Sequence, residues 1–310
     1  MTTPVFNPAN FAPGQPIDNN ELPYLPGTTL VYDTFTAGNV LEQIITVTVT
    51  EKPLKIDGVN CTVVSDIVTD AQTGQLIEKT QDYFAQDKSG NVWYFGEAAQ
   101  QYENGKLVGK EGSWKAGVHG AQPGIVMETS PQVGDSYDQE NAPGVAQDHA
   151  EVTKLTGSAS VPFGTFHHTL LVTLETSVLE PGAAETKYYA AGVGEVFGRD
   201  LVTGEQDRLV SVTTAAADSK TLSSALTDGG VISQFVQAMA AFGANDSGVR
   251  SGNATLPPND SGQQGVSQLL QAMTAFGASG PGVYSYSSNA TLLPHESGQH
   301  HFLAVHAHHG

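Results

Sequence analysis

The sequence has a single cysteine, two tryptophans and only 13 lysine and arginine residues among its 310 positions. Because Cys61 has no second cysteine to pair with, an internal disulfide and a thiolate metal cluster are both excluded. No apolar run approaches the roughly 20 residues that a transmembrane helix needs. The first 27 residues also lack the basic and apolar regions of a classical signal peptide.

The scarcity of basic residues leaves the chain acidic, with 32 aspartates and glutamates and a formal charge of −19. Residues 216–310 contain two basic and five acidic residues, a charge of −3, which leaves −16 for residues 1–215. Such a negative field repels nucleic acid and anionic membranes. We therefore expect no nucleic-acid partner, and we place the acidity in the first two thirds of the chain.

Residues 28–215 have the pattern of an antiparallel β domain. Between Ile45 and Thr50, β-branched apolar residues alternate with threonines, which is the period of a strand. Asp57-Gly58 and Asn104-Gly105 are tight-turn dipeptides between apolar runs. The spacing of such signals predicts about 10–12 strands, closed into a barrel or packed as a two-layer sandwich.

Residues 1–27 contain six prolines and little periodicity. Proline fixes φ and removes a backbone donor, so this segment is expected to be an extended arm lying over the β domain. Phe6, Phe11, Tyr24 and Leu25 are candidate anchors. A disordered tail is the alternative.

Residues 216–310 contain an internal repeat, with units at about 231–264 and 265–300. Each unit begins with an amphipathic helical pattern, and the two apolar stripes are Ile232, Phe235, Val236 and Met239, and Val266, Leu269, Leu270 and Met273. A helix of about 13 residues with one such stripe is not stable alone. The stripes must pack on each other, on the β domain or on a second copy, and we expect the chain to self-associate through them.

Six of the ten histidines fall in the last sixteen residues. His300, His301, His306 and His308 are the candidate ligands for a divalent metal such as Zn, Ni or Cu. Terminal histidine-rich tails also bind these metals adventitiously, and some are additions to the natural chain. No required cofactor is expected.

Five residues between positions 93 and 140 form the candidate ligand site: Trp93, Glu97, Trp114, Tyr137 and Glu140. Aromatic faces beside carboxylates suit a sugar or a cationic ligand, and an ordinary solvated acidic face is the alternative. A hydrolase or lyase using Glu97 and Glu140 ranks lowest. The sequence contains no G-x-S-x-G, P-loop or H-E-x-x-H motif, so we name no catalytic residue.

The residues Asp87, Gly90–Glu97, Tyr102–Gly105, Gly112–Trp114, Ala116-Gly117, Pro123–Ile125, Tyr188-Tyr189 and Gly192–Gly194 form a recognisable pattern. It resembles a family of bacterial extracytoplasmic β-rich proteins over roughly residues 20–200. The C-terminal repeats resemble segments of type I secreted proteins from alphaproteobacteria. The resemblance implies a β-rich, exported protein and transfers no catalytic residues.

Together these observations favour a non-enzymatic, secreted or cell-surface protein that self-associates through its repeats. The alternatives are a β-barrel module that binds a small apolar, sugar or cationic ligand, and a metal-binding protein acting through its histidine tail. Low lysine content and high glycine content favour export by a C-terminal type I signal, and a cytoplasmic location is the alternative.

Overall fold

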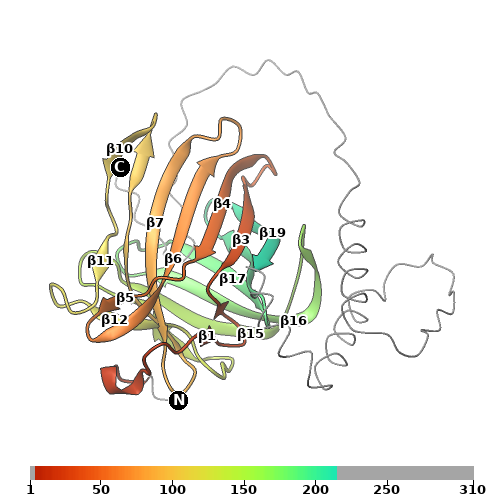
Figure 1. The fold of residues 1–310 in the computed structure, drawn as a ribbon. Coiled ribbons are helices and arrows are strands. Elements are labelled where there is room, and N and C mark those ends of the chain that lie inside the picture. The colour runs from red at the N-terminus through yellow and green to blue at the C-terminus, as the bar shows by residue number, and fades with distance from the viewer. Residues whose placement is uncertain (1–3, 215–310) are drawn as a thin grey trace, which may run out of the picture. The chain divides into compact units, whose positions relative to one another are not determined.

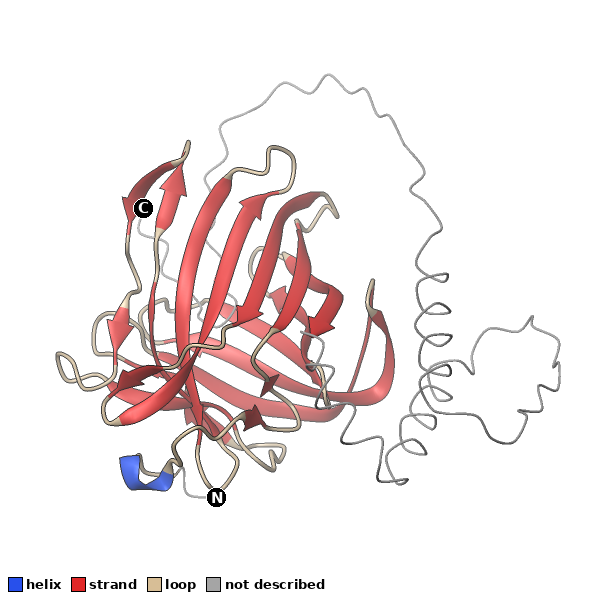
Figure 2. Cartoon of the chain, viewed as in Figure 1, coloured by secondary structure: helices blue, strands red, loops and turns tan. Residues whose placement is uncertain are grey.

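The structure is a computed structural model that describes residues 4–214 (Figure 1). Strands dominate this part of the chain, joined by turns and loops (Figure 2). None of its helices has the length and apolarity needed to cross a membrane. The helical repeats, their apolar stripes and the histidine-rich end, all expected from the sequence, lie outside the described residues.

The described chain contains one 3₁₀ helix and 19 strands. In chain order they are η1 (Pro8–Asn10), β1 (Ile17–Asp18), β2 (Pro23–Tyr24), β3 (Thr28–Phe35), β4 (Leu41–Val49), β5 (Leu54–Ile56), β6 (Val59–Asp70), β7 (Leu76–Gln86), β8 (Val92–Ala98), β9 (Gln101–Glu103), β10 (Lys106–Gly109), β11 (Trp114–Lys115), β12 (Gln122–Met127), β13 (Ser136–Asp138), β14 (Glu140–Asn141), β15 (Asp148–Val161), β16 (Gly164–Ser177), β17 (Ala184–Ala190), β18 (Gly194–Asp200) and β19 (Gln206–Thr214).

The long strands form one nearly closed antiparallel barrel, so the barrel, and not the sandwich, is confirmed (Figure 1). Neighbours follow chain order through β3, β4, β6, β7 and β8, and again from β15 to β19. Strand β19 pairs with β3, which places Leu209 beside Tyr32. Short strands connect β8 to β15 on the other side of the ring. Strand β12 pairs with β8 and with β14, and β13 pairs with β15.

Alternating side chains explain why these segments form barrel strands. Along β3 every second residue is buried, and the same alternation continues along most of β4. The buried Ile45 and Val47 alternate with partly exposed threonines, as the sequence pattern predicted. The Asp57-Gly58 and Asn104-Gly105 dipeptides both have positive φ angles, which the two-residue hairpin turn requires.

The N-terminal arm packs on the barrel at two levels. Outside it, the rings of Phe6 and Phe11 contact Trp93 and Phe95 of β8, with ring centroids 5.6–6.1 Å apart. Further along, the buried Tyr24 packs on Phe84 of β7 at 5.2 Å. These aromatic contacts give the proline-rich arm a defined place on the barrel.

Candidate functional site

Strand β8 carries a bulge that brings Tyr94 and Glu97 to the same side of the strand. The pairing with β7 shifts between Asp82↔Glu97 and Phe84↔Tyr94, so β8 uses one residue more than β7 over this stretch. Gly96 lies in the bulge with a φ of +116°, a conformation that glycine adopts readily. Two residues three positions apart therefore meet side by side.

The Tyr94 hydroxyl lies between two carboxyl groups. It is 2.8 Å from Oδ1 of Asp82 and 2.9 Å from Oε2 of Glu97, and all three side chains are buried. The Tyr94 ring stacks on Phe84 at 4.7 Å and meets the edge of Trp114 at 5.5 Å. Packing on both neighbours fixes the hydroxyl in this position, and we call Asp82, Tyr94 and Glu97 the acid triad.

Trp114 connects the acid triad to a second pair of carboxyl groups. It pairs with Glu97 across β11 and β8, and its indole Nε1 donates to Oε1 of Glu140 at 3.0 Å. Burial raises the pKa of Glu140 well above its ordinary value, and the neighbouring Asp148 and Glu97 raise it further.

A pocket of about 310 Å³ opens beside the acid triad. Its walls are mostly small apolar side chains from β8, β11 and two loops, and the lining residues are Glu97, Ala98, Ser113, Trp114, Lys115, Val118, His119, Ala121, Ala142, Pro143 and Val145. Its volume is at the lower end of the range for small-molecule sites, about 300–1,000 Å³. Glu97 and Trp114 thus face one pocket together.

Hydrogen bonds hold the rim of this pocket in place. The Ser113 hydroxyl accepts from the backbone N–H of Ala99 at 3.0 Å. The Gly117 N–H donates to the Ala121 carbonyl at 2.9 Å and closes the glycine-containing loop into a turn. These two hydrogen bonds fix the positions of the segments around Ser113 and Gly117, which lie at the pocket.

Two of the five candidate ligand residues lie elsewhere. Trp93 and Tyr137 line a separate pocket of about 490 Å³ beside the N-terminal arm. The Trp93 indole donates to Oδ2 of Asp87 at 2.9 Å, and its ring contacts Phe6. Both Trp93 and Tyr137 are almost fully buried.

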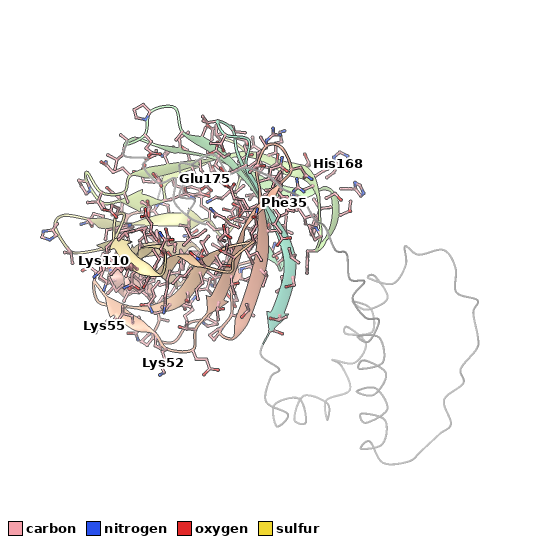
Figure 3. The ribbon with its side chains drawn as sticks, turned by 90° about the horizontal axis from the view of Figure 1, so that it is seen from above. Phe35, Lys52, Lys55, Lys110, His168 and Glu175 are labelled. Atoms are coloured by element: carbon pink, nitrogen blue, oxygen red, sulfur yellow. The ribbon has the colours of Figure 1, made fainter. Side chains whose placement is uncertain are left out.

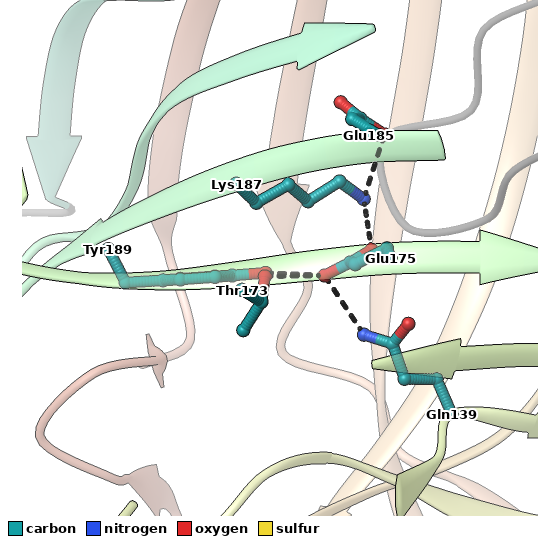
Figure 4. A network of polar contacts seen from close by, with 6 residues as sticks. All are labelled: Gln139, Thr173, Glu175, Glu185, Lys187 and Tyr189. Carbon is teal, nitrogen blue, oxygen red and sulfur yellow. Dashed lines mark hydrogen bonds and ion pairs between the residues drawn. The ribbon is translucent and has the colours of Figure 1, made fainter. Parts of the chain in front are cut away.

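A buried ion pair occupies another part of the barrel (Figure 4). Nζ of Lys187 is 3.1 Å from Oε2 of Glu175 and 3.7 Å from Oε2 of Glu185. Oε1 of Glu175 accepts from Thr173 at 3.0 Å and from Gln139 at 3.1 Å. Burial alone would lower the pKa of Lys187, but the surrounding carboxylates outweigh it and raise that pKa well above its ordinary value.

Acidic side chains outnumber basic ones among the buried residues of the barrel. Viewed from above, Glu175 lies within the ring of strands while Lys52 and Lys55 lie at the periphery (Figure 3). Apart from Asp87 in its turn, the buried acids are Asp66, Glu78, Asp82, Glu97, Glu140, Asp148, Glu175 and Glu195. Lys187 is the one buried basic residue in the described part of the chain.

Three of these acids have pKa values well above the ordinary carboxyl range. Burial is the largest cause for Asp66, Glu140 and Glu195. Nearby carboxylates add to it in each case, and the Lys187 ammonium partly opposes it at Glu195. Oδ1 of Asp66 is buried and accepts no hydrogen bond within residues 4–214. Each of these carboxyl groups therefore loses its proton less readily than an exposed carboxyl group does.

No group of three or more histidine, cysteine or acidic side chains within residues 4–214 is arranged to hold a metal ion. His300, His301, His306 and His308 lie outside the described residues, and the metal site stays a prediction. The same holds for the apolar stripes that begin at Ile232 and Val266.

The sequence did not point to Asp82 or Lys187, and it gave no special position to Tyr94. Tyr94 has Trp93 and Phe95 on either side and looks like an ordinary aromatic strand residue. The available signal was Gly96, because a glycine inside a strand pattern often marks a bulge.

No protein-family model and no curated protein matches the chain. Among solved structures, the chain is similar to a protein of Bacteroides fragilis described as exported, with a YmcC-like fold. The TM-score is 0.39 and the identity 14%, over 63% of this chain and 100% of that one. A protein of Parabacteroides distasonis described as a lipoprotein has a TM-score of 0.36 and 12% identity, over 63% and 99% of the two chains. These similarities assign no role to any residue, and the motif-based resemblance to extracytoplasmic proteins stays a prediction.

Proposed function

We propose that the barrel is a non-enzymatic binding module for a small, largely apolar ligand, held in the pocket beside Trp114. The pocket itself supports this proposal: a space of about 310 Å³ with mostly apolar walls, to which the acidic residue Glu97 and the ring of Trp114 also belong. Such a combination gives apolar contact area for affinity and one polar group for orientation.

The arrangement of the carboxyl groups favours binding over hydrolysis. Oε1 of Glu140 accepts from the Trp114 indole, and Glu140 is itself buried, with its pKa raised first by burial and then by the neighbouring Asp148 and Glu97. Glu140 does not line the pocket, whereas Glu97 does. A glycosidase-type mechanism needs both carboxyls at the substrate, so this geometry supports a binding role.

The proposal can be tested with benzyl alcohol, a small neutral probe, on the full-length protein. The two tryptophans give two indole N–H signals by NMR, and Trp114→Phe identifies which is which. We expect benzyl alcohol to shift the Trp114 signal and leave the Trp93 signal in place. A ligand with so few atoms should have a Kd of about 1 mM.

A matched pair of variants locates the site. Val118 and Val133 are both exposed, but only Val118 lines the pocket. Val118→Phe should weaken benzyl alcohol binding about tenfold by filling the space, and Val133→Phe should leave it within about twofold. Equal loss in both variants, or a Trp114 signal that does not respond, would reject the pocket as a binding site.

Self-association through residues 216–310, a metal site in the histidine tail and export from the cell all stay predictions from the sequence. They involve residues outside the described part of the chain or properties that the barrel does not reveal.

A further inference from the structure

Four neighbouring connections between strands form one rim of the barrel. They are residues 36–40 after β3, residues 142–147 after β14, residues 178–183 after β16 and residues 201–205 after β18. Strand register places them side by side, because β19 begins where β3 ends, β17 begins where β18 ends and β15 begins where β16 ends. Strands β3, β4 and β19 lie next to one another in Figure 1.

Six aliphatic side chains on this rim are exposed to solvent. Their exposed fractions lie between 36% and 69%, and the residues are Val40, Val145, Val178, Leu179, Leu201 and Val202. A single exposed aliphatic residue is ordinary on a protein surface, whereas a group of them on adjacent connections indicates a contact surface. We call the four connections the apolar rim.

The opposite rim has a different covering. There the N-terminal arm bonds to the turns that follow β7 and β17. The Lys88 N–H donates to the carbonyl of Asn10 at 2.8 Å, and the Gly192 N–H donates to the carbonyl of Asn20 at 2.7 Å. The arm thus packs at one end of the barrel, and the apolar rim lies at the other.

The backbone N–H group of each of these six residues donates a hydrogen bond within the protein. In three cases the acceptor is a side-chain oxygen 2.6–3.3 Å away: Thr36 for Val40, Ser177 for Leu179 and Asp200 for Val202. In the other three it is a backbone carbonyl 2.8–3.0 Å away: Ala142 for Val145, Gln147 for Val178 and Ala184 for Leu201. An N–H group finds no acceptor in an apolar phase, so a segment enters such a phase without a large loss of free energy only when its N–H groups are already bonded.

The charges of the apolar rim restrict the kind of surface that it fits. Among its residues only Glu180 and Glu205 are charged, and lysine, arginine and histidine are absent. An anionic membrane attracts basic residues and repels acidic ones. Zwitterionic lipid, such as phosphatidylcholine, carries no net charge and accepts aliphatic side chains, so it fits both properties of the rim.

We propose that the apolar rim docks on the surface of a zwitterionic lipid membrane, with its six aliphatic side chains inserted among the headgroups and the barrel outside. A fluid lipid surface adapts to side chains that project from separate connections, whereas a protein partner would need a surface of matching shape. The inference goes beyond the proposed function, because neither Leu201 nor Val202 lines the pocket beside Trp114.

Flotation of the full-length protein with lipid vesicles in a sucrose gradient tests the proposal. Vesicles of phosphatidylcholine alone are the probe, and vesicles that also contain phosphatidylglycerol add negative charge. We expect the protein to float with the first and to bind the second at least about threefold more weakly. Added salt should leave binding to phosphatidylcholine within about twofold, because aliphatic contact does not depend on screening.

Matched pairs of substitutions locate the contact. Leu201→Ser with Val202→Ser removes two side chains of the apolar rim and should weaken binding to phosphatidylcholine at least about tenfold. Leu54→Ser with Val133→Ser removes two exposed aliphatic side chains outside the rim and should leave binding within about twofold. Circular dichroism checks that both variants are folded.

A second rim variant repeats the test on another connection. Val178→Ser with Leu179→Ser should also weaken binding to phosphatidylcholine at least about tenfold, because these two side chains are exposed on the same rim.

Three results would overturn the proposal: no flotation with phosphatidylcholine, binding only to vesicles that contain phosphatidylglycerol, or equal binding by the rim and control variants. If the rim substitutions change the oligomeric state in light scattering and vesicles are not bound, the rim is a contact between copies of the chain and the lipid contact is rejected. Benzyl alcohol binding is measured separately, so failure of the proposed function leaves this test unaffected.

Discussion

Lys187 shows what a single residue contributes inside an acidic barrel. Its side chain and that of Glu175 are each 1% exposed, and their charged atoms are 3.1 Å apart. Each charge loses its hydration energy when it is buried, and the attraction between the two charges offsets that loss. If one partner is removed, the other stays buried with the loss uncompensated. Removing either member of the ion pair should therefore destabilise the folded barrel.

Removing the ammonium should destabilise the barrel strongly. Lys187→Met keeps most of the side-chain volume and removes the ammonium group that contacts Glu175 and Glu185, so we expect a loss of about 3–5 kcal/mol in unfolding free energy. Urea unfolding followed by circular dichroism measures it. Lys55→Met, at an exposed position, should change the value by no more than about 0.5 kcal/mol. A loss below about 1 kcal/mol for Lys187→Met would contradict the buried pair.

At the residue scale, sequence reasoning put Glu97, Trp114 and Glu140 into one site with Trp93 and Tyr137, and the structure does not bring all five together. Glu140 holds the Trp114 indole, and Glu97 and Trp114 share the pocket, while Trp93 and Tyr137 line another one. Which residues meet depends on strand register, and register is set by contacts between strands that are distant along the chain. A single sequence does not record those contacts.

Strand β8 shows how one glycine decides the arrangement of an element. Strict alternation from Trp93 would place Glu97 on the side of Trp93 and Phe95, but the bulge at Gly96 places it beside Tyr94. A Cβ atom at Gly96 would collide with the carbonyl oxygen of Trp114, so β11 can approach β8 only because that atom is absent. The close approach of these two strands builds one wall of the pocket.

Gly96→Ala should therefore lower the unfolding free energy by more than the strain of a positive φ angle alone. We expect a loss of about 2–4 kcal/mol, combining the backbone strain with the collision against β11. Gly74 has a φ of +69° and open space around it, so Gly74→Ala should cost only about 1–2 kcal/mol. Urea unfolding of both variants gives the difference, and equal losses would show that the contact with Trp114 is unimportant.

At the element scale, local sequence patterns predicted strands and turns correctly. Alternation predicted the strands, and the Asp57-Gly58 and Asn104-Gly105 dipeptides predicted hairpin turns that the structure contains. The bulge at Gly96 was not predicted, because a glycine inside a strand marks a bulge, a bend or a close approach equally well.

For the whole molecule, the important feature is where the negative charge lies. The sequence placed a charge of −16 in residues 1–215 and favoured solvated acidic faces, whereas at least eight acids of the barrel are buried. Val64, Asp66 and Val68 show the reason. The aspartate lies in phase with the two valines and so points the same way. A charge total carries no information on strand faces, but the phase of an acid within an apolar alternation does.

The buried acids predict a stability that decreases as pH rises. For Asp66, Glu140 and Glu195 the folded-state pKa is raised above the ordinary carboxyl value, so the folded chain binds more protons than the unfolded chain at intermediate pH. Their stabilising contribution is complete below a pH of about 4, the unfolded carboxyl pKa, and is lost as the pH rises through the folded-state values.

Urea unfolding at pH 5 and pH 8 tests this expectation. The midpoint should be higher at pH 5 than at pH 8, and Asp66→Asn should reduce the difference because it removes one of the titrating groups. A midpoint that increases from pH 5 to pH 8 would mean that these carboxyls are ionised in the folded barrel.

The pairing of β19 with β3 has a consequence for how the chain reaches this fold. The first and last long strands of the barrel are neighbours, with Thr28 beside Thr214. A ribosome or an export channel releases these strands at different times, so the ring cannot join until nearly all of the barrel sequence is free. Pairing across so long a loop is intrinsically slow. Before β3 and β19 pair, their edges and the buried acids of the barrel are open to water. The fold is completed only after β19 has been released.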